Sequence, residues 1–234
     1  MATIGRAAVA EGVGTALLVA VVVGSGIFAQ RLSPTDEGLQ LLENSTATAM
    51  GLVALILAFG PVSGAHFNPV VTLADRLLGG LDTARAAVYV AAQVAGGCAG
   101  AAVANLMFEL PAVDWSATSR SGSHLWLGEV VATFGLLTVI FGVVRSGRPG
   151  AAPLAVGAYI GAAYWFTSST SFANPAVTVA RTLTDTFAGI RPTSVPPFVL
   201  AQLTGGLLAV SLARFLHPAL PDAAEDVILP HHQD

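Results

Sequence analysis

The chain has 234 residues, of which 54% are hydrophobic and only 10% are charged, and its mean hydropathy is +0.71. Soluble domains carry about 25% charged residues, so this composition excludes an ordinary soluble protein and indicates one that crosses a membrane several times. The single Cys98 excludes a disulfide framework and a thiolate metal site, and we expect no metal, no cofactor and no nucleic-acid partner.

Six apolar stretches can each cross a hydrocarbon core of about 30 Å, which takes roughly 20 helical residues. Two further apolar segments, His66–Leu78 and Asn174–Leu183, are too short to cross at about 10–13 residues and favour re-entrant half-helices. Two half-helices placed end to end would together span the membrane once. The six predicted spans are Ala7–Ala29, Leu41–Gly60, Ala84–Met107, Leu125–Val144, Ala151–Phe166 and Pro197–Leu216.

Three motifs occur twice along the chain, at a nearly constant separation of about 110 residues. This indicates a duplication, with a first repeat at 1–112 (re-entrant helix about 66–78), a second at 113–221 (re-entrant helix about 174–184) and a tail at 222–234. Three spans per repeat is an odd number, so the second repeat must be inverted in the membrane. Inverted repeats with broken helices form a site at the midplane. The paired motifs are Glu11–Thr15 with Glu129–Thr133, Asn68–Leu77 with Asn174–Leu183, and Ala92–Gly97 with Ala201–Gly206.

The arginines predict the orientation, since short cytoplasmic loops are enriched in basic residues. With the N-terminus inside, six arginines lie in inner segments and four in outer ones, which favours cytoplasmic termini in a plasma (inner) membrane. The tail residues His231 and His232 are typical of a solvent-exposed end. The inner set is Arg6, Arg76, Arg85, Arg145, Arg148 and Arg214, and the outer set is Arg31, Arg120, Arg181 and Arg191.

Each short segment begins with Asn-Pro, at Asn68-Pro69 and at Asn174-Pro175. Asparagine is a strong N-cap, and proline at the first helical position loses no hydrogen bond. Irregular backbone at membrane depth is tolerated only within protein or along a watery cavity. Two half-helices that meet point to point therefore predict a pore.

At these residues the chain resembles the major intrinsic proteins, the aquaporins and aquaglyceroporins. The resemblance covers nearly the whole length and includes the early Glu, S-G-A-H-F-N-P, A-A-Q-V-A-G-G, the second Glu and N-P-A. It implies an all-α membrane protein of six transmembrane helices and two re-entrant half-helices in an inverted repeat, usually a homotetramer in the bilayer with one pore per subunit.

The resemblance assigns the pore motif to two sets, Asn68, Pro69 and Val70 and then Asn174, Pro175 and Ala176. Both asparagines would donate to a passing oxygen, while the two helix N-termini repel cations. Val70 replaces the usual Ala, which could narrow or tilt that side of the pore. In the family the residues matching Glu11, Glu129, Gln93 and Gln202 have a scaffold role, and His66 is either a loop hydrogen-bonding residue or a gate.

The outer constriction departs from the family, because Val177 stands where most members carry the arginine of an aromatic/Arg filter. Correspondence with the family's filter positions implies that the other filter residues are Thr48, Ser171 and either Tyr164 or Ala162, with Tyr164 slightly preferred. Loss of bulk would widen the pore, and loss of the guanidinium would remove five donors. This predicts a channel for glycerol, arsenite and similar neutral metalloid hydroxides, with water, akin to a bacterial aquaglyceroporin subgroup of arsenic-resistance operons.

Arg181 lies one helical turn beyond Val177 and could reach back to the outer mouth as a displaced charge. It would then draw in weakly acidic or anionic oxyacids such as pentavalent arsenicals. The favoured alternative is an external cap paired with Asp185.

Other classes of function fit less well. A proton-coupled secondary transporter needs a titrating carboxylate that faces the site, for which Glu11 and Glu129 are the candidates. An intramembrane hydrolase needs a Ser–His pair, but His124 and His217 fall near opposite helix ends. We therefore expect no enzymatic activity, and an open filter argues against a purely structural junction protein.

Overall fold

The structure, a computed structural model, describes residues 3–216, so the predicted tail 222–234 with His231 and His232 lies outside the described residues. All regular secondary structure in the described part of the chain is helical, which confirms the predicted all-α class. The helices are α1 Ile4–Leu32, α2 Glu37–Ser63, α3 Pro69–Leu78, α4 Thr83–Met107, α5 Ser123–Arg145, α6 Ala152–Phe166, α7 Pro175–Ala180 and α8 Val195–Leu216, with short 3-10 turns at η1 Pro149–Ala151, η2 Arg181–Leu183 and η3 Pro192–Ser194.

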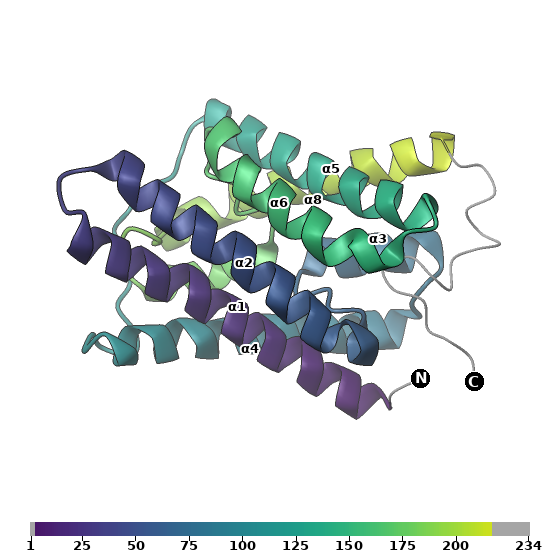
Figure 1. The fold of residues 1–234 in the computed structure, drawn as a ribbon, viewed down its shortest axis with the longest axis horizontal. Helices are drawn as coiled ribbons and strands as arrows, with labels where there is room; N and C mark the ends of the chain where they lie inside the picture. Colours follow the sequence, from purple (N-terminus) through teal and green to yellow (C-terminus); the bar gives the residue numbers. More distant parts are fainter. Residues whose placement is uncertain (1–2, 217–234) are drawn as a thin grey trace.

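Five segments of residues 3–216 are long and apolar enough to cross a membrane, namely α1, α2, α4, α5 and α8 with its preceding turn η3. The sixth predicted span, α6, has 15 residues and is preceded by η1. At 1.5 Å per helical residue and about 2 Å per 3-10 residue, the two together extend about 28 Å. This is close to the thickness of a hydrocarbon core, and α6 lies along α2 and α5 in the bundle (Figure 1).

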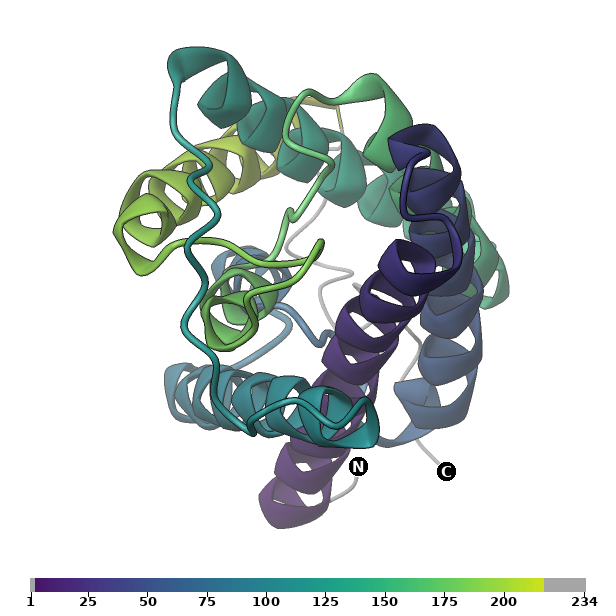
Figure 2. The same cartoon turned by 90° about the vertical axis from the view of Figure 1, so that its left-hand side faces the viewer.

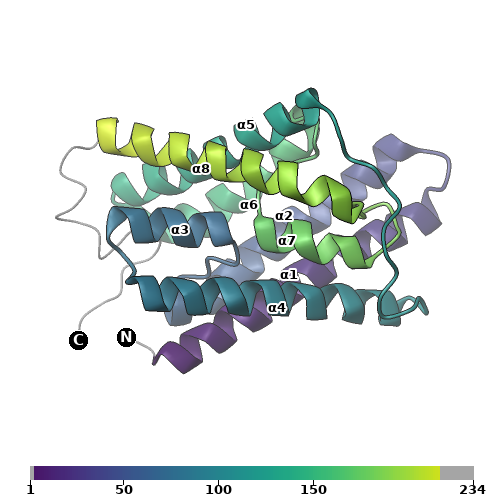
Figure 3. The same cartoon turned by 180° about the vertical axis from the view of Figure 1, so that it is seen from behind.

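Equivalent helices of the two halves pack in the same way. In the first half α1 packs against α2 and α4, and in the second half α5 packs against α6 and α8, while α2 and α6 join the halves. The described ends of α1 at Ile4 and of α8 at Leu216 lie at the same end of the bundle (Figures 1 and 3). That arrangement is the one that an even number of spans requires.

The two half-helices α3 and α7 meet in the middle of the molecule, end to end between α4 and α8 (Figure 3). Asn68 caps α3, since its side chain accepts from the backbone nitrogen of Val70 at 3.0 Å. Asn174 caps α7 in the same way, accepting from Ala176 at 3.0 Å and Val177 at 3.2 Å. Each proline occupies the first helical position, so the Asn-Pro dipeptide starts both helices as predicted from capping.

Glycines on the long helices let the half-helices approach closely. A side chain at Gly206 of α8 would overlap Val70 of α3, and one at Gly97 of α4 would press on Ala180 and on the carbonyl of Ala176. Small residues at helix interfaces are the usual means of close packing in lipid.

The long connection between α4 and α5 crosses the end of the bundle opposite to Ile4, over the segment that follows α7 (Figure 2). Its backbone nitrogens at Asp114 and Ser116 donate to the carbonyls of Leu183 and Thr182. The backbone nitrogen of Ala117 donates to the carboxylate of Asp185 at 2.9 Å. This connection therefore holds the segment that follows the second half-helix in place.

Candidate functional site

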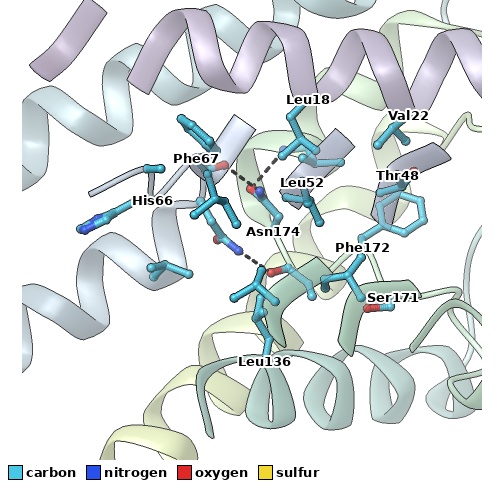
Figure 4. Close-up of a pocket in the computed structure, with 18 of the residues that line it drawn as sticks. Leu18, Val22, Thr48, Leu52, His66, Phe67, Leu136, Ser171, Phe172 and Asn174 are labelled. Carbon is cyan, nitrogen blue, oxygen red and sulfur yellow. Dashed lines mark hydrogen bonds between the residues drawn. The ribbon is translucent and has the colours of Figure 1, made fainter. Parts of the chain in front are cut away.

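A cavity of about 70 Å³ lies where the two half-helices meet, between both halves of the chain (Figure 4). A cavity must offer about 10–15 Å³ to hold a single water, so this one has room for more than one. Most of its wall is apolar, with polar groups from the two loops and from one end. The residues that carry polar groups into the lining are Thr48, His66, Asn68, Tyr164, Ser171, Asn174 and Arg181.

The two asparagines that begin the half-helices are tied to each other's loop. The side-chain nitrogen of Asn68 donates to the carbonyl of Ala173 at 2.7 Å, and that of Asn174 donates to the carbonyl of Phe67 at 2.8 Å. An amide nitrogen has two hydrogens, so each asparagine keeps one for a molecule in the cavity. The reciprocal bonds fix both donors in the lining where the two loops meet, and Figure 4 shows Asn174 beside Phe67.

The loops before the half-helices hold non-glycine residues in the left-handed backbone region, at matching positions. Ala65 and Phe67 have φ of 51° and 50°, and Ser171 and Ala173 have φ of 52° and 48°. Such residues cost about 1–3 kcal/mol each and persist where the surroundings fix them, typically at functional sites. All four line the cavity, so the strained backbone is the part of the chain that forms its wall.

Two buried carboxylates provide what fixes these loops. Glu11 accepts from the backbone nitrogens of His66 at 2.9 Å and Phe67 at 2.7 Å, and Gln93 donates to it at 2.7 Å. Neither Glu11 nor Gln93 belongs to the cavity lining. The predicted scaffold residues of the first half therefore lie behind the loop, where they hold it.

The second half repeats this arrangement. Glu129 accepts from the backbone nitrogens of Phe172 at 2.9 Å and Ala173 at 2.8 Å, and Gln202 donates to it at 2.6 Å. Gln202 also donates to the hydroxyl of Thr178 on α7 at 2.9 Å, so the network reaches from α5 through α8 to the half-helix.

The four predicted filter residues all belong to the cavity lining. Thr48 of α2 and Tyr164 of α6 lie with their hydroxyl oxygens 3.2 Å apart, and Ser171 and Val177 complete the set. Tyr164 is buried in the lining whereas Ala162 is exposed on the outside of α6, so of these two candidates Tyr164 is the one that faces the cavity. The hydroxyl of Ser171 is buried without a hydrogen-bond partner among the described residues, which leaves it available to a molecule in the cavity.

The departure at Val70 does not narrow the cavity. Its side chain is buried against Gly206 of α8 and is not part of the lining. A glycine on α8 thus accommodates the two extra methyl carbons, a compensation that the sequence of α3 alone does not reveal.

Arg181 is placed differently from the favoured expectation of an external cap paired with Asp185. It is 2% exposed and lines the cavity, while the carboxylate of Asp185 is bonded to Ala117 in the α4–α5 connection. The Arg181 guanidinium stacks on the ring of Phe172, with 3.5 Å between its central carbon and the ring centroid, and its Nε donates to the carbonyl of Ala188. The i+4 pairing is wrong because the chain leaves the helix at η2, so that Asp185 is no longer one turn away.

Three residues near the site were not found by the sequence analysis. Phe172 and Arg120 gather with Arg181, since the Arg120 guanidinium lies 5.1 Å from the same ring. Burial lowers the pKa of the Arg120 guanidinium, and the carboxylate of Glu129 opposes that shift. Asp75 pairs with His66, with 3.5 Å between Oδ2 and Nε2. The duplication in the sequence points to Phe172 and Asp75. Phe172 and Arg181 are separated from Asn174 by the same numbers of residues as His66 and Asp75 are from Asn68.

Comparison with known proteins gives a consistent result. The sequence pattern of the major intrinsic protein family matches residues 1–173. Aquaglyceroporin AqpS of Rhizobium meliloti (strain 1021) is 54% identical over 217 residues, which are 92% of each chain, and human Aquaporin-2 is 33% identical over 65% of this chain and 57% of its own. The X-ray structure of the aquaglyceroporin from Plasmodium falciparum superposes with a TM-score of 0.71 at 19% identity, covering 93% of this chain and 99% of the other.

Proposed function

Because this chain belongs to the major intrinsic protein family, it is a multi-pass membrane protein and a passive channel for small solutes rather than an enzyme, and we propose that its solutes include glycerol, arsenite and similar neutral metalloid hydroxides, together with water. The observation that carries this proposal is Val177 in the cavity lining, together with the hydroxyls of Thr48 and Tyr164. An apolar side chain of this size leaves room where an arginine would cross the lumen. Neutral polyols and hydroxides then find donors at Asn68 and Asn174.

The position of the carboxylates supports passive conduction over proton-coupled transport. Glu11 and Glu129 are both fully buried behind the loops and bonded to backbone nitrogens. A coupling carboxylate has to face the transported solute, and neither of these belongs to the lining.

A second group of solutes, weakly acidic or anionic oxyacids such as pentavalent arsenicals, is favoured by one further observation. Of the three guanidinium nitrogens of Arg181, only Nε has a hydrogen-bond acceptor among the described residues. The four hydrogens on its two terminal nitrogens are therefore left for the cavity. A guanidinium fork matches the paired oxygens of an oxyacid. Arg181→Gln is expected to slow the uptake of such acids while glycerol uptake continues.

We further propose a homotetramer in the plasma (inner) membrane with both termini in the cytoplasm. The arginine distribution and the shared end of Ile4 and Leu216 support that orientation. Cross-linking in native membranes and protease protection of an N-terminal tag test the two statements separately.

The experiment for the main proposal is stopped-flow light scattering on proteoliposomes. Vesicles are shrunk in sucrose to measure water flux, then placed in glycerol to follow re-swelling, and then loaded with arsenite. Glycerol and arsenite uptake at least about tenfold above that of empty vesicles supports the proposal. Water flux without glycerol flux would contradict it and would assign the closure to Tyr164.

A further inference from the structure

The two half-helices carry opposite charges at equivalent positions. Asp75 lies seven residues after Asn68, and Arg181 lies seven residues after Asn174. Both side chains are buried, with 6% exposure for the aspartate and 2% for the arginine. Because the halves are inverted relative to one another, the negative charge lies toward one mouth of the channel and the positive charge toward the other.

Each charge rests against the ring that stands two residues before the asparagine of its own half. On the inner side this ring is His66, whose Nε2 lies 3.5 Å from Oδ2 of Asp75 and whose Nδ1 lies 3.0 Å from the hydroxyl of Thr72. His66 lines the cavity and Asp75 does not. The imidazole therefore stands between the carboxylate and the lumen.

On the outer side the ring and the charge both belong to the cavity lining, so the charge itself reaches the lumen. The ring of Phe172 supports the guanidinium of Arg181 from one face, and the carbonyl of Ala188 accepts from its Nε. Stacking on an aromatic face stabilises a guanidinium that has lost its contacts with water. Arg181 is thus held as a fixed cation in the wall of the cavity.

The surroundings leave this outer charge without a neutralising partner. Within residues 3–216 no carboxylate forms a salt bridge with Arg181 or with Arg120. The carboxylate of Glu129 attracts both guanidinium groups from a distance. Its oxygens, however, accept hydrogen bonds from the backbone nitrogens of Phe172 and Ala173. Arg120 donates to the carbonyls of Gly189 and Phe187, on either side of Ala188, and so helps to hold the segment that carries the Arg181 acceptor.

We propose that Arg181 is the residue that excludes cations from this channel, in place of the guanidinium that is absent at Val177. The inference rests on the proposed function of a solute channel. A fixed positive charge in a low-dielectric wall opposes the passage of a cation far more strongly than it would in water. Because the charge is set one helical turn further out, the lumen at Val177 stays wide for neutral solutes while the barrier to cations is kept.

The test measures K⁺ leak and glycerol uptake in the same proteoliposomes, with a KCl gradient and a potential-sensitive dye. Arg181→Gln is expected to raise K⁺ permeability at least about tenfold, a larger factor than any change in glycerol uptake measured in the same vesicles. Arg191→Gln, which removes an exposed arginine of the same outer segment, is the matched control and should leave K⁺ permeability unchanged. The double variant Val177→Arg with Arg181→Gln should again have the low K⁺ permeability of the wild type.

The proposal would be overturned if the Arg181→Gln channel conducts glycerol and its K⁺ permeability stays at the wild-type value. Should that variant fail to assemble, the proposal is tested by comparing the K⁺ leak of wild-type vesicles with that of Phe172→Leu vesicles. Wild-type vesicles must then leak K⁺ no faster than empty ones, and Phe172→Leu, which frees the guanidinium, must leak faster than wild type. Glycerol uptake by the wild type is measured separately, so a failure of the proposed function is not confused with a failure of the cation barrier.

Discussion

The hydroxyl oxygens of Thr48 and Tyr164 lie 3.2 Å apart and link α2 to α6 across the two halves of the chain, beside the cavity. Neither helix carries both groups, so the pair exists only when the halves are assembled. Both side chains line the cavity together with Val177, so we expect their bulk to help determine which solutes fit.

Replacing Thr48 by Phe is expected to restrict the channel at this point. A phenyl ring adds bulk where the threonine side chain now lies and removes the hydroxyl that meets Tyr164. We expect glycerol uptake to fall at least about tenfold, with water permeability reduced by less than about threefold, because water is narrower than glycerol. Stopped-flow light scattering on proteoliposomes measures both.

The matched control for this substitution is Thr46→Phe, the same change two residues earlier on α2. Thr46 is exposed on the outside of the helix and is not in the cavity lining, so its replacement should leave both fluxes unchanged. Equal loss of glycerol and water flux in Thr48→Phe would show that the substitution disrupts the bundle instead of the filter.

Replacing Glu129 by Gln is expected to destabilise the second loop. The carboxylate accepts from Phe172, Ala173 and Gln202, and an amide would place hydrogens against at least one of these donors. A buried donor left without an acceptor costs about 1–3 kcal/mol. We expect a lower unfolding temperature in detergent and slower flux of every solute, and the exposed Glu109→Gln should change neither.

Much of this architecture could be predicted from the sequence, because it follows from length, capping and duplication. Apolar length located the spans, and Asn-Pro located the starts of α3 and α7. What could not be predicted depends on contacts between segments far apart. The 3-10 turn after Ala180 turns Asp185 away from Arg181, and the glycine that accommodates Val70 belongs to another helix. The role of Phe172 likewise depends on the guanidinium of Arg181, which rests on its ring nine residues further along the chain.

Replacing Val70 by Ala separates packing from selectivity. The valine side chain fills the space that Gly206 leaves between α3 and α8 and does not reach the cavity. Removing two methyl carbons should cost about 1–2 kcal/mol of stability through lost contacts. The ratio of glycerol to water permeability should stay within about twofold of wild type, and a larger shift would mean that this position shapes the pore after all.

The most direct test of the proposed function is Val177→Arg, measured as glycerol and arsenite uptake by proteoliposomes. Restoring the long cationic side chain should place it across the lumen near Thr48 and Tyr164, next to the guanidinium of Arg181. We expect at least about a tenfold loss of uptake for both solutes, with water flux largely kept. Uptake of glycerol and arsenite at wild-type rates through Val177→Arg would contradict the proposed function, because the width at position 177 would then not govern which solutes pass.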